Sequence, residues 1–226
     1  IKIMMMPAAE EWDGKSKLSY NQLHEVEIED LLPREKIEVD MECIKQMLAG
    51  HRILITGAAG SIGSEMARQV AMLNPSELVL VDQAETPMHD VRLYMKRNHS
   101  DLKVWTIVGS ITNKSQMDII FAVHKPEYVF HAAAYKHVPM MEDNPAMAVQ
   151  NNVFGRRVIA DLAVKYGTKK FVMISTDKAV NPTNVMGCSK RICEIYCQSL
   201  NQAIQDGVVI GVTQFVTTRF GNVLGS

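Results

Sequence analysis

The chain has 226 residues, of which 47% are hydrophobic and 22% are charged, and its formal net charge is −1. This length can bury a substantial core, and one domain of roughly 150 to 200 residues plus an extra segment is the expected organisation. The balanced charge gives no electrostatic reason to expect nucleic acid as a partner. The sequence also lacks an apolar run of about 18 residues and a cleavable signal sequence, so it predicts no membrane-spanning helix within these residues.

Residues 1–50 differ in composition from the rest of the chain. They are polar and acidic, apart from a helical spacing of apolar residues over 41–48, and we expect them to form an N-terminal linker or extension. The chain begins with Ile1 and stops at Ser226, just after an apparent strand. We therefore expect it to be a fragment of a longer protein, with a domain boundary between residues 50 and 51.

From residue 51 onward, short apolar runs alternate with stretches of helical spacing, the first of which covers residues 61–73. Strands are expected at 52–57, 77–82, 103–108, 128–132, 170–175 and 209–215. Strands that are apolar throughout and separated by helices are typical of a parallel sheet covered on both faces. The sequence therefore predicts an α/β fold with a doubly wound parallel sheet over residues 51–226.

The turn after the first expected strand reads GAAGSIG over residues 57–63. Glycine in such a turn lets a pyrophosphate approach backbone amides and lets the next helix pack tightly on the strand. The start of that helix offers free N–H groups and the positive end of its dipole to phosphate groups. The predicted phosphate-binding residues are Gly57, Gly60, Ser61, Ile62 and Gly63.

Asp82 ends the second expected strand, 19 residues after the last glycine of the turn. A carboxylate at this position accepts hydrogen bonds from the ribose hydroxyls of adenosine. It also repels a 2′-phosphate, and no Arg or Lys follows it in residues 83–85. The sequence therefore predicts an NAD(P)-binding Rossmann fold in which NAD is favoured over NADP. A purely structural glycine turn is the alternative.

The glycine spacing GxxGxxG resembles that of the short-chain dehydrogenase/reductase superfamily, in particular its extended branch, which modifies sugar nucleotides. Two further segments agree with this resemblance. After the fourth expected strand, the small residues Ala132 and Ala133 would run beside the cofactor. Ser110 and Ile111 follow the third expected strand, where members of the superfamily place adenine, although an Asp is usual at the position of Ser110.

In the same superfamily, a Tyr and a Lys four residues apart on one helix face form the catalytic pair. Lys190 stands at the Lys position, but Met186 replaces the Tyr and cannot transfer a proton. Asp177 and Lys178 directly follow the fifth expected strand, at the sheet edge where ligands bind. Of a carboxyl group and an amino group that lie side by side, one can act as the general acid and the other as the general base. A surface ion pair is the alternative interpretation.

Two longer motifs make the resemblance more specific. Residues 176–187 read TDKAVNPTNVMG, and residues 131–142 read HAAAYKHVPMME. Together they closely resemble the large, membrane-anchored UDP-N-acetylglucosamine 4,6-dehydratases of bacterial capsule, O-antigen and protein-glycan synthesis. The resemblance covers almost the whole chain, and methionine in place of the tyrosine is itself a feature of these large members. It implies a lyase that recycles NAD internally and yields a UDP-4-keto-6-deoxy sugar.

The resemblance also implies roles for individual residues. Asp177 would protonate the departing 6-hydroxyl group, and Lys178 would remove the proton from C5. Thr176 would hydrogen-bond the 4-oxygen, and Lys190 would orient the nicotinamide ribose. Because Met186 carries no proton, either a water molecule or Lys178 would take the proton of the 4-hydroxyl group.

On the substrate side, the resemblance points to Lys136, His137 and Asn222 as contacts of the UDP-sugar. Solvated loop charge is the alternative for the first two, and Asn152 is expected to hydrogen-bond backbone near the fourth strand. A smaller C-terminal substrate domain, truncated here, would complete the pocket. The soluble fragment should therefore bind NAD but convert the UDP-sugar only weakly. The parent protein would lie at the cytoplasmic face of the bacterial inner membrane, anchored through segments outside this chain, and could assemble as a homo-oligomer.

Two other functions stay open at this point. One is an NAD-dependent nucleotide-sugar epimerase, although such enzymes usually keep the tyrosine. The other is a non-catalytic NAD-binding module of a polysaccharide-assembly complex, against which the intact Asp177 and Lys178 argue. The four cysteines lack the paired spacing of a metal site, so we expect neither a bound metal nor a disulfide. This composition is typical of a protein in a reducing compartment.

Overall fold

The computed structural model describes residues 4–5, 24–25 and 40–221 of the chain. The contacts divide the chain into two compact units, residues 1–40 and residues 41–226. In the first unit, strands β1 (Met4–Met5) and β2 (His24–Glu25) pair antiparallel. The second unit contains all the other described elements and the candidate site.

The second unit is built on one sheet of parallel strands. Its strands are β3 (Arg52–Thr56), β4 (Glu77–Asp82), β5 (Val104–Val108), β6 (Tyr128–His131), β7 (Lys170–Thr176) and β8 (Gln214–Phe220). Their order is β5-β4-β3-β6-β7-β8, and every neighbouring pair is parallel. This is the predicted doubly wound sheet. The strand order reverses between β3 and β6, which is where such sheets bind ligands at the carboxyl ends of their strands.

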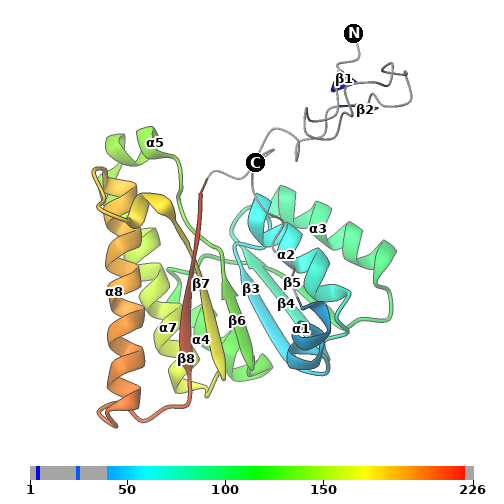
Figure 1. Cartoon of the computed structure of the whole chain (residues 1–226). Coiled ribbons are helices and arrows are strands. Elements are labelled where there is room, and N and C mark those ends of the chain that lie inside the picture. The colour runs from blue at the N-terminus through cyan, green and yellow to red at the C-terminus, as the bar shows by residue number, and fades with distance from the viewer. Residues whose placement is uncertain (1–3, 6–23, 26–39, 222–226) are drawn as a thin grey trace, which may run out of the picture. The chain divides into compact units, whose positions relative to one another are not determined.

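Helices lie on both faces of this sheet (Figure 1). The longer helices are α1 (Met41–Leu48), α2 (Ser61–Ala71), α3 (Glu85–Asn98), α4 (Lys114–His124), α7 (Arg156–Lys165) and α8 (Val185–Gln205). Alternate residues of a strand face opposite sides. Ile53 and Ile55 of β3 therefore pack with α1, α2 and α3, whereas Leu54 packs with α4, α7 and α8. Burial on both sides explains why the central strand β3 is apolar from Ile53 to Ile55.

Short helices occupy the loops at the carboxyl edge of the sheet. They are α5 (Val138–Asp143), α6 (Pro145–Ala148), the π-helix η3 (Val149–Gly155) and the 3₁₀-helix η4 (Asp177–Ala179). None of them was predicted from the sequence. Three follow β6 in direct succession, and η4 follows β7, so all four lie close to the predicted ligand-binding edge.

The expected position of the last strand was wrong. It was predicted at 209–215, but β8 covers Gln214–Phe220, and Ile210 in the preceding loop is 96% exposed. The apolar run before the strand was mistaken for the strand itself. Since β8 is a sheet edge, its own residues include the polar Thr217, Thr218 and Arg219. The ends of the other predicted elements differ from the observed ones by no more than two residues, the usual uncertainty of such limits.

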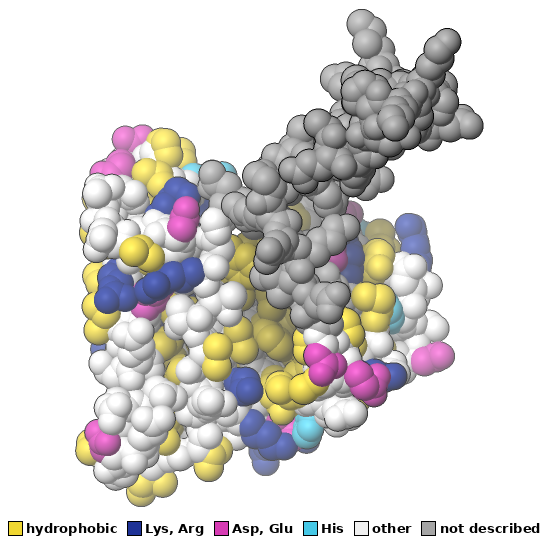
Figure 2. Space-filling view, in the orientation of Figure 1, with side chains coloured by type: hydrophobic (Ala, Val, Ile, Leu, Met, Phe, Trp, Pro, Cys, Tyr) yellow, Lys and Arg dark blue, Asp and Glu magenta, His cyan; other side chains and the backbone are white. Residues whose placement is uncertain are grey.

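Part of the sheet remains accessible on the side of α1–α3. Phe130, Val172 and Val216 are register partners on β6, β7 and β8, and all three are only half-buried. Figure 2 shows hydrophobic side chains gathered over the strands in the middle of the view. Among the described residues, no helix has both the length and the apolar character needed to cross a membrane.

Candidate cofactor and active site

The turn between β3 and α2 requires glycine at residue 57. Gly57 has a φ of +74°, and its N–H donates to the carbonyl of Val81 over 2.8 Å. A Cβ atom there would lie 2.4 Å from the backbone nitrogen of Ala133. Gly63 is equally confined, because its Cβ would lie 2.0 Å from the carbonyl oxygen of Gly57. The glycines therefore bring the turn, the start of α2 and the segment after β6 into direct backbone contact.

The start of α2 is open to a ligand. Gly60 is its N-cap residue and offers no side-chain cap. The N–H groups of the first turn of a helix have no partner within the helix, and the helix dipole adds positive potential there. Gly60, Ser61, Ile62 and Gly63 line a cavity of about 520 Å³ together with residues of the loop after β6. This arrangement suits a phosphate group.

Asp82 lies beside the turn at the end of β4. Its two carboxylate oxygens accept hydrogen bonds from the backbone N–H groups of Ala59, over 3.0 Å, and Ala84, over 2.9 Å. These bonds hold the carboxylate in a fixed orientation, and each oxygen still has capacity for a second donor. Asp82 lines a cavity of about 230 Å³. The cavity also includes the predicted cofactor-binding residues Gly57, Gly60, Ser110, Ile111, Ala132 and Ala133.

A third cavity, of about 370 Å³, lies at the ends of β7 and β8. The predicted catalytic and substrate-binding residues that line it are Thr176, Lys178, Met186, Lys190, Lys136 and His137. The three cavities share lining residues: Ala132 belongs to all of them. Together they form one crevice along the carboxyl edge of the sheet, from Asp82 on β4 to Lys178 after β7. A crevice of this kind suits a dinucleotide with a substrate bound beyond it.

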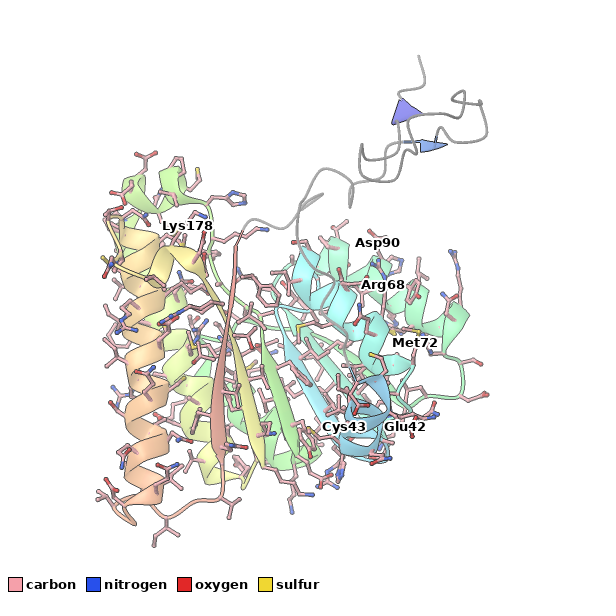
Figure 3. The ribbon with its side chains drawn as sticks, in the orientation of Figure 1. Glu42, Cys43, Arg68, Met72, Asp90 and Lys178 are labelled. Carbon is pink, nitrogen blue, oxygen red and sulfur yellow. The ribbon has the colours of Figure 1, made fainter. Side chains whose placement is uncertain are left out.

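Asp177 is the one predicted catalytic residue of the described part that does not line this cavity. Its carboxylate is more than half exposed and accepts hydrogen bonds from the Thr176 hydroxyl, over 2.9 Å, and the Lys178 ammonium, over 3.3 Å. These two bonds, that of Thr176 first, lower the pKa of Asp177 below its usual value. Figure 3 shows Lys178 near the top of the sheet, beside the start of α8.

Lys190 is buried below the same cavity. Its ammonium group donates to the carbonyl of Ile174 on β7 over 3.1 Å, and Lys190 as a whole is only 5% exposed. Burial, and then the nearby charge of Arg156, lowers the pKa of Lys190 well below its ordinary value. The fully buried His131 responds in the same way, with burial and Arg156 lowering its pKa. Burial and the charge of Arg156 thus disfavour the positively charged forms of Lys190 and His131.

The loop after β6 is tied to the crevice by side-chain hydrogen bonds, and two of the residues involved, Gln83 and Tyr135, were not predicted from the sequence. Gln83 donates to the Tyr135 hydroxyl over 3.1 Å, and both residues line the cavity beside Asp82. The backbone of Tyr135 is held in turn by Asn152, as expected for that residue, through bonds of 2.8 and 3.0 Å. Lys136 donates to the Ser61 hydroxyl over 3.3 Å. The signal for Tyr135 lay in the motif itself, but its partner Gln83 is 52 residues away.

Two further predictions concern residues and groups at the margin of the site. Asn222 lies outside the described residues. Within residues 40–221, no group of three or more His, Cys, Asp or Glu side chains is arranged to hold a metal ion. Cys193 and Cys197 are buried, Cys43 and Cys188 are exposed, and none of the four forms a disulfide.

The chain is similar to known proteins over most or all of its length. Residues 53–226 match a protein family described as polysaccharide biosynthesis protein. The chain is 41% identical over 227 residues to the capsular polysaccharide biosynthesis protein CapD of Staphylococcus aureus, covering 100% of this chain and 37% of that protein. It is 31% identical over 182 residues to the UDP-N-acetylglucosamine 4,6-dehydratase (inverting) of Campylobacter jejuni, covering 80% and 51% respectively. The chain therefore spans about half, or less, of the length of these relatives.

Solved structures share the fold. The UDP-glucose 4-epimerase of Thermotoga maritima, solved with UDP-glucose, has a TM-score of 0.64 and 27% identity, covering 76% of this chain and 56% of that one. The enzyme WbmG of Bordetella bronchiseptica, solved with NAD and UDP, has a TM-score of 0.58 and 26% identity, covering 76% and 53%. These likenesses confirm the predicted Rossmann fold, and the matches above confirm the predicted resemblance.

Proposed function

The chain belongs to the polysaccharide biosynthesis protein family, and from this premise we propose that it is the NAD-binding half of a nucleotide-sugar 4,6-dehydratase. The substrate is UDP-N-acetylglucosamine, and the product is a UDP-4-keto-6-deoxy sugar for capsule or O-antigen synthesis. One observation carries the proposal. Thr176 and Lys178 line the cavity at the end of β7 with Lys190, while the tyrosine position of that helix holds the buried Met186. Epimerases of this superfamily usually keep the tyrosine, so the present set of groups favours dehydration over epimerisation.

The cofactor proposal rests on the geometry of the turn. The backbone N–H groups at the start of α2 bind the pyrophosphate, and Asp82 binds the ribose hydroxyls of adenosine. Ser110 and Ile111 contact adenine, and Ala132 and Ala133 run beside the cofactor. NAD is favoured over NADP because a 2′-phosphate would meet the Asp82 carboxylate. When bound, NAD supplies a reversible hydride acceptor for sugar C4 and donor for C6.

The residues of this chain then move the protons. Thr176 hydrogen-bonds the 4-oxygen of the sugar, and a water molecule or Lys178 takes the proton of the 4-hydroxyl group and passes it to solvent. Lys178, once neutral, removes the C5 proton that the 4-ketone makes acidic, and it returns a proton to C5 when the hydride reaches C6. Asp177 gives a proton to the departing 6-hydroxyl group, so this carboxyl group must first gain one, against its lowered pKa. A substrate that excludes water and separates the Asp177 carboxylate from Lys178 would raise this pKa. Lys190 orients the nicotinamide ribose.

Substrate contacts and surroundings complete the proposal. Lys136, His137 and Asn222 bind the UDP-sugar. A region beyond this chain completes the sugar pocket, because the chain spans only 51% of the C. jejuni dehydratase. Residues 1–226 alone therefore bind NAD but convert the UDP-sugar only weakly. The longer protein acts at the cytoplasmic face of the bacterial inner membrane.

Mass spectrometry tests the reaction. The longer protein is incubated with NAD and UDP-N-acetylglucosamine, and the expected product has lost one water. The variant Lys178→Met should lose this product, because it removes the C5 base. The matched control is Lys165→Met, which removes the ammonium of an exposed Lys-Asp pair formed with Asp118 over 2.7 Å. An epimerised sugar of unchanged mass, or no product with NAD bound, contradicts the proposal.

A further inference from the structure

A buried carboxylate lies directly behind the proposed catalytic segment. Glu194 of α8 is fully buried and accepts hydrogen bonds from three side chains. The Ser175 hydroxyl donates over 2.7 Å and Arg191 over 3.0 Å. Arg219 donates twice, over 2.9 and 2.7 Å, in the two-pronged geometry that fixes orientation best. Burial alone would raise the pKa of Glu194, but these bonds outweigh it and lower the pKa to about 2.

Two of the partners of Glu194 lie at the ends of the strands that form the cavity, and one of them, Ser175, lines it. Ser175 and Arg219 are register partners on β7 and β8. Each is followed directly by a residue that lines the cavity, Thr176 after Ser175 and Phe220 after Arg219. Glu194 therefore joins α8 to the ends of both strands at the point where each enters the site.

The other end of the catalytic segment is held by close packing. A Cβ atom at Gly187, in the first turn of α8, would lie 2.3 Å from the carbonyl oxygen of Lys178. The backbone of Lys178 thus rests directly on α8. The segment from Thr176 to Lys178 is bracketed by α8 at both ends, through Glu194 before it and Gly187 after it.

We propose that Glu194 is a positioning residue that sets the direction in which Thr176 and Lys178 enter the cavity, acting through Ser175 and Arg219. Glu194 itself neither lines the cavity nor touches a reacting group, and it reaches the cavity lining through Ser175. The assignment of a catalytic effect rests on the function proposed above, whereas the effect on the order of the segment does not.

A comparison within the molecule separates positioning from stability. Glu77 is a second buried carboxylate, with hydrogen bonds from Trp105 over 2.7 Å and Lys103 over 2.9 Å. It is the first residue of β4, so it lies at the edge of the sheet opposite the site. Neutralising either glutamate removes a buried, hydrogen-bonded charge, and only Glu194 is connected to the site. Glu77→Gln is therefore the matched control for Glu194→Gln.

Hydrogen exchange of the 226-residue chain gives the first readout. In Glu194→Gln the amides of residues 176–179 should exchange about tenfold faster than in the original chain, because the strand ends lose an anchor. Glu77→Gln should leave these amides unchanged, and both variants should keep the affinity for NAD. Ser175→Ala, which removes one hydrogen bond only, serves where Glu194→Gln fails to fold, and should change the same amides to a smaller extent.

Turnover of the longer protein gives the second readout. We expect kcat to fall about 10- to 100-fold in Glu194→Gln with little change in KM, since misplacement of reacting groups acts on the chemical step. The losses in Ser175→Ala and Glu194→Gln should be non-additive in the double variant. Equal exchange and equal kcat in Glu194→Gln and Glu77→Gln would refute the positioning role. A longer protein that makes no dehydrated product refutes the proposed function, and the exchange result still decides whether Glu194 orders the segment.

Discussion

Replacing Gly57 by alanine perturbs the turn on which cofactor binding depends. The substitution has two costs that the structure separates. A residue with a side chain at φ +74° is about 1–2 kcal/mol less stable than glycine. In addition, the new Cβ would lie 2.4 to 2.7 Å from backbone atoms of Ala132 and Ala133, which cannot rotate away, and forced overpacking of this kind costs about 1–3 kcal/mol.

Gly50 offers the control for the first cost alone. Its φ is +73°, and a Cβ there would meet no atom within 4 Å. We expect Gly57→Ala to lose about 3 kcal/mol, which lowers Tm by about 6–12 °C, and Gly50→Ala to lose about 1 kcal/mol. The Gly57 variant should also bind NAD at least about tenfold more weakly, because the backbone must move where the pyrophosphate lies.

Thermal unfolding and isothermal titration with NAD measure both effects. The difference in Tm between the two variants reports the close contact between the turn and the segment after β6. If Gly57→Ala and Gly50→Ala show the same Tm and the same Kd for NAD, the contact does not shape the binding site and the reasoning is refuted.

Three further predictions use the same chain. Asp82→Asn should raise the Kd for NAD about tenfold or more and that for NADP less, because a charged acceptor is lost and a repulsion relieved; equal changes in the two titrations would contradict this. Gln83→Ala should speed NAD release in stopped-flow measurements, because the bond from Gln83 to Tyr135 spans the cavity beside Asp82; an unchanged release rate argues against such a restraint. The pKa of Glu194, lowered from 4.5 to about 2, corresponds to about 3 kcal/mol of folding free energy that is present above pH 4.5 and lost as pH falls toward 2. The difference in unfolding free energy between the original chain and Glu194→Gln should therefore shrink over that range in urea titrations, and a constant difference would contradict the assignment.

The parts of the fold that the sequence predicted are those with a local cause. Gly57, the run of apolar residues in β3 and Asp82 at the end of β4 each follow from neighbouring residues, and each lies where it was expected. The position of β8 failed because its cause is not local. An edge strand needs no continuous apolar run, and the exposed residues around Ile210 imitated one.

The candidate site divides in the same way. Lys190 and Met186 share a helix face, so their common cavity follows from the helical repeat. The same repeat places Glu194 on the face of Lys190, but its hydrogen-bond partners do not follow from any local pattern. These partners depend on the register that sets Ser175 of β7 beside Arg219 of β8, residues 44 positions apart in the chain. The position of Asp177 outside the cavity lining was also beyond reach, because it depends on the turn of the short helix η4.

A crystal structure of the chain with NAD tests the central claim most directly. The account predicts the pyrophosphate against the backbone N–H groups at the start of α2, with the adenosine ribose within hydrogen-bonding distance of Asp82 and the nicotinamide ribose at Lys190. A dinucleotide bound elsewhere, or a crevice that stays without NAD at saturating concentration, would contradict the account.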